Sequence, residues 1–147
     1  TMNIETAMVM LKERISSLEI YEDIESDTLK FARAAFSLNE NPKSIVLSMG
    51  MIKKIIENNN IILSHIELIT LLTHPDIEFL QLEYLLIIDD HDEPIEISND
   101  DMADAYTTGY LQNPKNPDQL IYDYNDFIFP TFVINDAYTD NINWRDQ

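Results

Sequence analysis

The residues with the most evident chemical capacity form one acidic run, Asp89–Glu93, with the sequence DDHDE. Carboxylate oxygens are ligands for divalent cations, and an imidazole stands among them. A calcium-binding loop, however, needs alternate acidic residues, a central glycine and a closing glutamate, and Pro94 stands near the place of that glycine. We therefore interpret the run as a solvated turn, and we expect neither a metal ion nor a cofactor.

The histidines and glycines do not form a catalytic motif either. His65 and His74 are nine residues apart, which is not the one-turn spacing of a helical zinc pair. Gly50 and Gly109 are too few for a phosphate-cradling loop, and the lack of cysteine excludes thiolate nucleophiles. We predict that the protein is not an enzyme. A metal-dependent hydrolase that uses Asp89–Glu93 is a distant alternative.

The remaining chemistry is charge, which is concentrated in one half of the chain. The 147 residues include 27 Asp and Glu against 9 Lys and Arg, a formal net charge of −18. Residues 1–70 contribute −3 of this charge and residues 71–147 contribute −15. Such a field repels nucleic acid and anionic membranes, because binding to either needs Lys and Arg. It attracts a basic protein surface and speeds association with it.

Tyrosines and aspartates alternate in this acidic half, and together they are typical of an interface. Tyrosine anchors protein interfaces, and complementary charge steers docking. We expect Asp123 and Asp126, which are flanked by tyrosines, to meet Arg or Lys on a partner. The residues predicted to bind that partner are Asp100, Asp101, Asp104, Tyr106, Tyr110, Tyr122, Asp123, Tyr124 and Asp126. The alternative is that the aromatic residues form the core of a β region and the acidic residues its solvated face.

The elements that must position these residues change type near the middle of the chain. In residues 1–74, apolar side chains recur at helical spacing. The first predicted helix buries Ile4, Met8, Leu11, Ile15 and Leu18. The second is capped at Ser26 or Asp27, the third begins at Asn41-Pro42, and the fourth is capped at Asn60 and buries Ile62, Ile66 and Ile69.

From residue 75 onward the apolar pattern takes a period of two, which indicates strands. We predict a β-hairpin formed by residues 77–88 and 94–98, with a helix that starts at Pro75 as the alternative. Ser98 and Asp101 resemble a capping box at the start of a further helix. Residues 113–118 read as a loop, and residues 120–132 as β structure in which Pro130 marks an edge strand or an interruption.

These elements predict an α+β fold in which about four helices in residues 1–74 pack with a small antiparallel sheet and one further helix in residues 75–147. The length suggests a single domain over residues 1–147. The hydrophobic content of 45% is enough for a folded core. Neither a transmembrane run nor a secretory signal is expected, so we predict a cytoplasmic protein.

Two classes of function fit these features. The first is a small acidic inhibitor that occludes a basic partner, most simply an immunity protein that neutralises a nuclease-type toxin. This is an analogy of size and composition only. The second is a helical adaptor or homo-oligomeric assembly protein that buries the stripe of Ile4, Met8, Leu11 and Ile15 against a copy of itself. A phage-type nucleic-acid mimic is a further alternative, although it would need acidic residues along an elongated surface.

Overall fold

The computed structural model describes residues 3–89 and 91–140, and the chain divides into two compact units. Unit 1 consists of residues 1–81 and 132–147, and unit 2 is the continuous segment 82–131. The predicted α+β fold class is confirmed. The prediction of a single domain stays a prediction.

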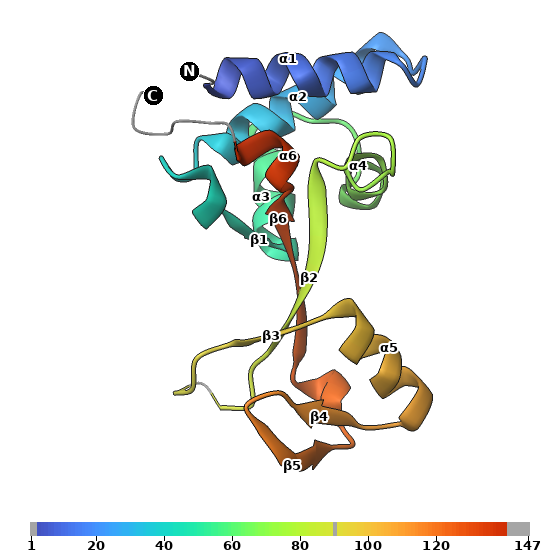
Figure 1. Ribbon diagram of the computed structural model, residues 1–147. Helices are drawn as coiled ribbons and strands as arrows, with labels where there is room; N and C mark the ends of the chain where they lie inside the picture. Colours follow the sequence, from blue (N-terminus) through green and yellow to red (C-terminus); the bar gives the residue numbers. More distant parts are fainter. Residues whose placement is uncertain (1–2, 90, 141–147) are drawn as a thin grey trace. The chain divides into compact units, whose positions relative to one another are not determined.

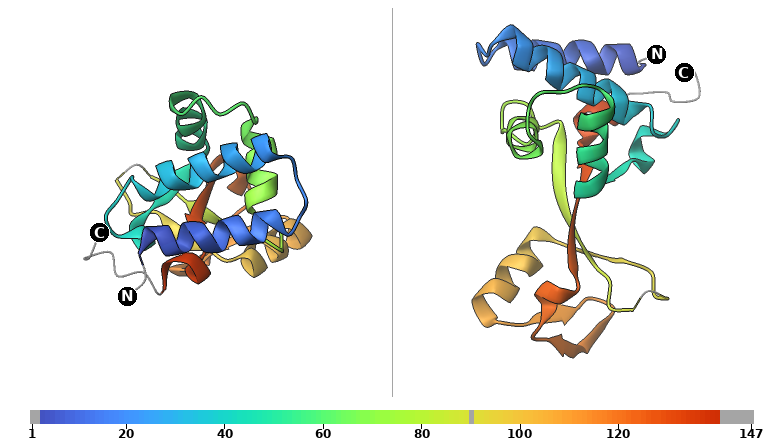
Figure 2. Two further views of the ribbon diagram at one scale, coloured as in Figure 1. Left: turned by 90° about the horizontal axis from the view of Figure 1, so that it is seen from above. Right: turned by 180° about the vertical axis from the view of Figure 1, so that it is seen from behind.

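The described part of unit 1 is mainly helical. Its elements are α1 (Ile4–Ser16), α2 (Glu22–Phe36), the 3₁₀ helix η1 (Pro42–Ser44), β1 (Val46–Ser48), α3 (Met49–Asn58), α4 (His65–Leu72) and α6 (Asp136–Thr139). Helices α1 and α2 lie side by side in the views of Figures 1 and 2. In the residues that the structure describes, no helix is long and apolar enough to cross a membrane.

Helix α1 buries the middle of the apolar stripe that its sequence predicts, whereas Ile4 is only half-buried and Leu18, also half-buried, lies beyond the end of the helix at Ser16. Met8, Leu11 and Ile15 are buried inside unit 1, and Leu11 and Ile15 are fully inaccessible to solvent. The Asn3 side chain caps this helix by accepting a hydrogen bond from the Thr6 amide at 3.1 Å. Because the stripe already packs within unit 1, it is not available to pack against a second copy of the chain.

Helix α2 begins before the predicted cap residues. It starts at Glu22, so Ser26 and Asp27 lie inside the helix. The buried Asp27 carboxylate accepts hydrogen bonds from the backbone amides of Ile62 at 2.9 Å and Leu63 at 3.3 Å. Asp27 therefore satisfies the backbone of a distant loop rather than the start of its own helix.

The next two predicted helix starts are also wrong. Asn41 caps only the short η1, and strand β1 follows, so α3 starts at Met49 with the Ser48 hydroxyl as its cap. Helix α4 starts after Ser64 rather than Asn60, and it buries Leu68 and Leu72. This later start leaves two of the isoleucines predicted to be buried exposed: Ile62 is 92% exposed and Ile66 is 66% exposed.

An aromatic cluster forms the centre of unit 1. The Phe79 ring packs edge to face against Phe36 at 5.6 Å and against Tyr138 at 5.1 Å between centroids. Arg14 lies over the Tyr138 ring and donates hydrogen bonds to the Tyr138 hydroxyl at 3.2 Å and to the Ile77 carbonyl at 3.1 Å. The Tyr138 hydroxyl also donates to the Ile77 carbonyl. Burial raises the pKa of this hydroxyl, against the lowering effect of Arg14.

Strands β2 (Leu80–Leu86), β3 (Ile95–Ile97) and β6 (Ile128–Ile134) join β1 in a sheet of order β1-β6-β2-β3. The predicted hairpin of residues 77–88 and 94–98 is confirmed, since β2 and β3 pair antiparallel with Tyr84 opposite Ile97. Pro130 lies within β6, which stands between β1 and β2 in the sheet order. Strand β1 has three residues and β6 has seven, so β1 leaves part of that edge of β6 uncovered, and the edge position predicted for Pro130 stays a prediction.

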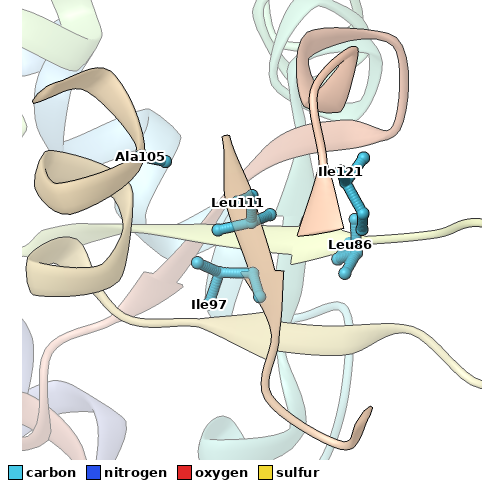
Figure 3. Packing of buried hydrophobic residues seen from close by; sticks show 5 residues of the cluster. All are labelled: Leu86, Ile97, Ala105, Leu111 and Ile121. Carbon is cyan, nitrogen blue, oxygen red and sulfur yellow. The ribbon is translucent and has the colours of Figure 1, made fainter. Parts of the chain in front are cut away.

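Unit 2 builds its own small core. Besides parts of β2 and β6 and strand β3, its elements are α5 (Asn99–Thr108), β4 (Leu111–Asn113), β5 (Asn116–Ile121) and the 3₁₀ helix η2 (Tyr124–Asp126). The side chains in Figure 3 come from β2, β3, α5, β4 and β5 and are Leu86, Ile97, Ala105, Leu111 and Ile121. Strands β4 and β5 form an antiparallel hairpin, so residues 113–118 are not a loop throughout as predicted.

The hydrogen-bonded Tyr138 hydroxyl gives a stability prediction. Tyr138→Phe should lower the free energy of unfolding by about 1 kcal/mol, because the Ile77 carbonyl and Arg14 each lose a buried partner. Tyr21→Phe is the matched control, since the Tyr21 side chain is 81% exposed. Urea unfolding monitored by circular dichroism measures both variants. Equal stabilities of the two variants would contradict this role for the hydroxyl.

Candidate functional site

All nine residues predicted to bind a partner lie in unit 2. Helix α5 carries Asp100, Asp101, Asp104 and Tyr106, and Tyr110 directly precedes β4. The other four, Tyr122 to Tyr124 and Asp126, follow β5 in the chain. The clearest contact between the two groups is between rings: Tyr110 and Tyr122 lie 5.6 Å apart at an interplanar angle of 53°. The β4–β5 hairpin makes this contact, because it brings the residues before β4 next to those after β5.

The ends of α5 are fixed by local chemistry. The Ser98 hydroxyl accepts a hydrogen bond from the Asp101 amide at 3.1 Å, which confirms the predicted helix start. The acidic residues of the first turn favour the positive end of the helix dipole. At the other end Gly109 takes a left-handed conformation with φ +86°, which a side chain would strain. The Thr108 hydroxyl donates to the Tyr110 carbonyl at 3.0 Å and so ties the helix end to β4.

The tyrosines of the predicted site differ in exposure. Tyr106 is 87% exposed and Tyr122 is 70% exposed. Tyr110 is half-buried beside Tyr122, and Tyr124 is half-buried against the core cluster of unit 2. Tyr124 therefore contributes to the core of unit 2, as expected if the aromatic residues are structural rather than part of an interface. Tyr106 and Tyr122 have rings free to contact another molecule.

The acidic side chains of the predicted site have no cation beside them in the described part of unit 2. Asp100, Asp101, Asp104, Asp123 and Asp126 are all exposed. In unit 1, by contrast, Arg33 pairs with Glu5 and Lys43 pairs with Asp140. The sequence of unit 2 holds twelve acidic residues and one lysine, a formal charge of −11. Unit 2 therefore has a large negative net charge, because its one lysine offsets only one of the twelve acidic residues.

A groove beside α5 is a feature that the sequence interpretation missed. It has a volume of about 410 Å³, and every residue that lines it belongs to unit 2. Asp101, Asp104 and Thr108 of α5 and Tyr110, Gln112 and Asn113 around β4 contribute to its lining. The sequence signal for this groove is the short run Leu111–Asn113, which forms the first strand of a hairpin although the prolines that follow it suggest a loop.

The acidic run at residues 89–93 forms a turn. The Asp89 carboxylate accepts a hydrogen bond from the His91 amide, and the Asp89 carbonyl accepts one from the Asp92 amide, both at 3.0 Å. Asp90 lies outside the described residues. Over residues 3–89 and 91–140, no three His, Cys, Asp or Glu side chains are grouped so that they could hold a metal ion.

Comparison with known proteins gives no relative from which a function could be transferred. No protein-family model, no curated protein and no solved structure matches the chain. The surface of unit 2 must therefore be interpreted from its own chemistry.

The exposure of Asp123 and Asp126 predicts that their charges contribute little to folding. Asp123→Asn with Asp126→Asn should change the free energy of unfolding by less than about 0.5 kcal/mol, as is usual for exposed sites. Asp27→Ala should instead cost about 2 kcal/mol, because two backbone amides lose a charged acceptor. Urea unfolding of the three proteins tests both values. A large loss in the double variant would make these aspartates structural.

Proposed function

We propose that this protein is a small acidic inhibitor that binds and occludes a basic partner, most simply an immunity protein of a nuclease-type toxin. One observation carries the proposal. Two largely exposed tyrosines, Tyr106 and Tyr122, stand in a unit whose charge is −11 and whose predicted contact aspartates have no neighbouring cation. A solvated surface does not need exposed aromatic rings, whereas an interface uses them as anchors.

Inhibition would follow from occlusion. A nuclease holds substrate phosphates with Arg and Lys, and carboxylates can take the place of those phosphates through charge-assisted hydrogen bonds. The negative field of unit 2 would steer the partner toward this surface and raise the association rate. Tyr106 and Tyr122 would then supply contact area at a small cost in conformational entropy.

The uneven charge favours an inhibitor of a protein over a nucleic-acid mimic. Unit 2 has a formal charge of −11 in 50 residues, while unit 1 has −7 in 97 residues. A mimic needs acidic groups at regular, phosphate-like spacing along the molecule. The burial of Met8, Leu11 and Ile15 also removes the surface on which the self-assembly alternative depended.

The direct test is capture of partners on the immobilised full chain from a lysate of the source organism. Elution first at low and then at high salt separates electrostatic from apolar association, because salt screens exposed charges. Release of one basic protein by salt supports the proposal. Recovery of the chain alone, or of partners that resist salt, contradicts it.

Charge reversal tests where the partner binds. Asp123→Lys with Asp126→Lys should slow association with the captured partner by about tenfold, because the steering field is reversed at the expected contact. Glu40→Lys with Glu57→Lys makes the same change in net charge on exposed residues of unit 1 and is the control. Surface plasmon resonance measures both rates. Equal slowing by both pairs would refute the assignment of the contact to unit 2.

A further inference from the structure

We infer that the groove between α5 and β4 is a docking pocket for one arginine side chain of a partner protein. The inference rests on the proposed function, because it names the group that the acidic surface would receive. Three features of the groove support the inference: its negative charge, the tyrosine in its lining and the hydrogen bonds that hold two of its lining residues in place.

The charge of the groove is complementary to a cation. Asp101 and Asp104 contribute to its lining from α5, and their spacing of three residues puts them on one face of the helix. Two carboxylates on one helical face repel each other unless a cation lies between them. No Lys or Arg lines the groove in the part of unit 2 that the structure describes. A cation from outside the chain would therefore relieve this repulsion.

A tyrosine in the lining favours guanidinium among cations. Tyr110 is one of the residues that line the groove, and its ring lies 5.6 Å from the Tyr122 ring between centroids. Arginine is planar, so it can stack on an aromatic face while its N–H groups bind carboxylates in a fork. The ammonium of lysine is compact and more strongly hydrated, and it cannot make both contacts in this way. Gln112 and Thr108 are neutral polar residues of the same lining.

Hydrogen bonds in the β4–β5 hairpin hold two residues of the lining, Gln112 and Asn113. The Gln112 side-chain Nε2 donates to the Pro117 carbonyl at 2.9 Å. The Asn113 side-chain Nδ2 donates to the Gln119 side-chain oxygen at 2.9 Å. The Asn113 side-chain oxygen accepts a hydrogen bond from the Lys115 backbone amide, also at 2.9 Å. Because these groups are already ordered, a ligand that enters the groove loses less free energy to ordering the site. The volume of about 410 Å³ is within the range of pockets that bind small ligands.

The test is a titration of the ¹⁵N-labelled full chain with Nα-acetyl-arginine methylamide at low ionic strength, followed by nuclear magnetic resonance. The amide resonances of Asp101, Asp104, Gln112 and Asn113 should shift to saturation, with a roughly millimolar dissociation constant for so small a probe. The corresponding lysine derivative should bind about tenfold more weakly, because it lacks the fork and the stacking contact. Equal shifts with both derivatives, or shifts spread evenly over unit 2, would overturn the assignment.

Variants locate the binding within the groove. Asp101→Asn with Asp104→Asn should abolish saturable binding, whereas Glu96→Gln with Asp118→Asn removes the same charge from exposed residues of unit 2 outside the groove and should retain it. Asp104→Asn alone should weaken binding by about tenfold through the loss of one charge-assisted contact. This single change lies beyond the first turn of α5, so it tests the groove even if the double variant loosens the helix. Unchanged binding in Asp104→Asn overturns the inference.

The partner from lysate capture separates this inference from the proposed function. If Asp104→Asn leaves the affinity for that basic partner unchanged, the groove is not its arginine pocket, and the proposed function still stands. If the arginine probe binds in the groove but capture yields no basic partner, the proposed function fails, and the groove remains a guanidinium site.

Discussion

The chain leaves unit 1 after residue 81 and returns to it at residue 132, so two distant segments must be held together in unit 1. Unit 2 is one continuous segment, 82–131, inserted between two parts of unit 1, so the residues before and after it must be fixed. Backbone bonding does part of this, since the Asn135 amide donates to the Phe79 carbonyl at 2.9 Å. The Ile77 carbonyl does the rest by accepting hydrogen bonds from both Arg14 and Tyr138. A charged side chain of the first helix thus holds both flanks of the insertion.

The two units use charge in different ways. In unit 1 the exposed cations Arg33 and Lys43 are paired with Glu5 and Asp140. Exposed pairs of this kind contribute little to stability, but they neutralise the surface locally. The described acidic residues of α5 and η2 in unit 2 have no such pairs, so their field extends into solvent up to the screening length. A field of one sign affects solubility and the rate of association with charged molecules rather than the fold.

The sequence predicts a partner-binding segment from residue type alone, and that assignment stays a prediction, whereas the geometry of these residues comes only from the structure. Tyrosine and aspartate in alternation indicate an interface because of what each side chain contributes there. The sequence does not tell that Tyr124 packs against the core while Tyr122 is exposed, since both residues stand in the same short acidic segment. The sequence also does not predict the contact between Tyr110 and Tyr122. That contact depends on the β4–β5 hairpin, and the prolines in and beside its strands suggest a loop instead.

Local features could be predicted from the residues alone: the α+β class, the middle of the buried stripe of α1, the hairpin of β2 and β3 and the start of α5 at Ser98. Each depends on periodicity or on a cap within a few residues. The tertiary structure alone decided where capping residues act, as Asp27 shows by binding amides 35 and 36 residues away. The groove beside α5 also depends on tertiary structure, because its lining combines residues of α5 with residues around β4. The physical reason is that a polar side chain bonds whichever unsatisfied backbone group the fold brings within reach, and sequence separation does not reveal that group.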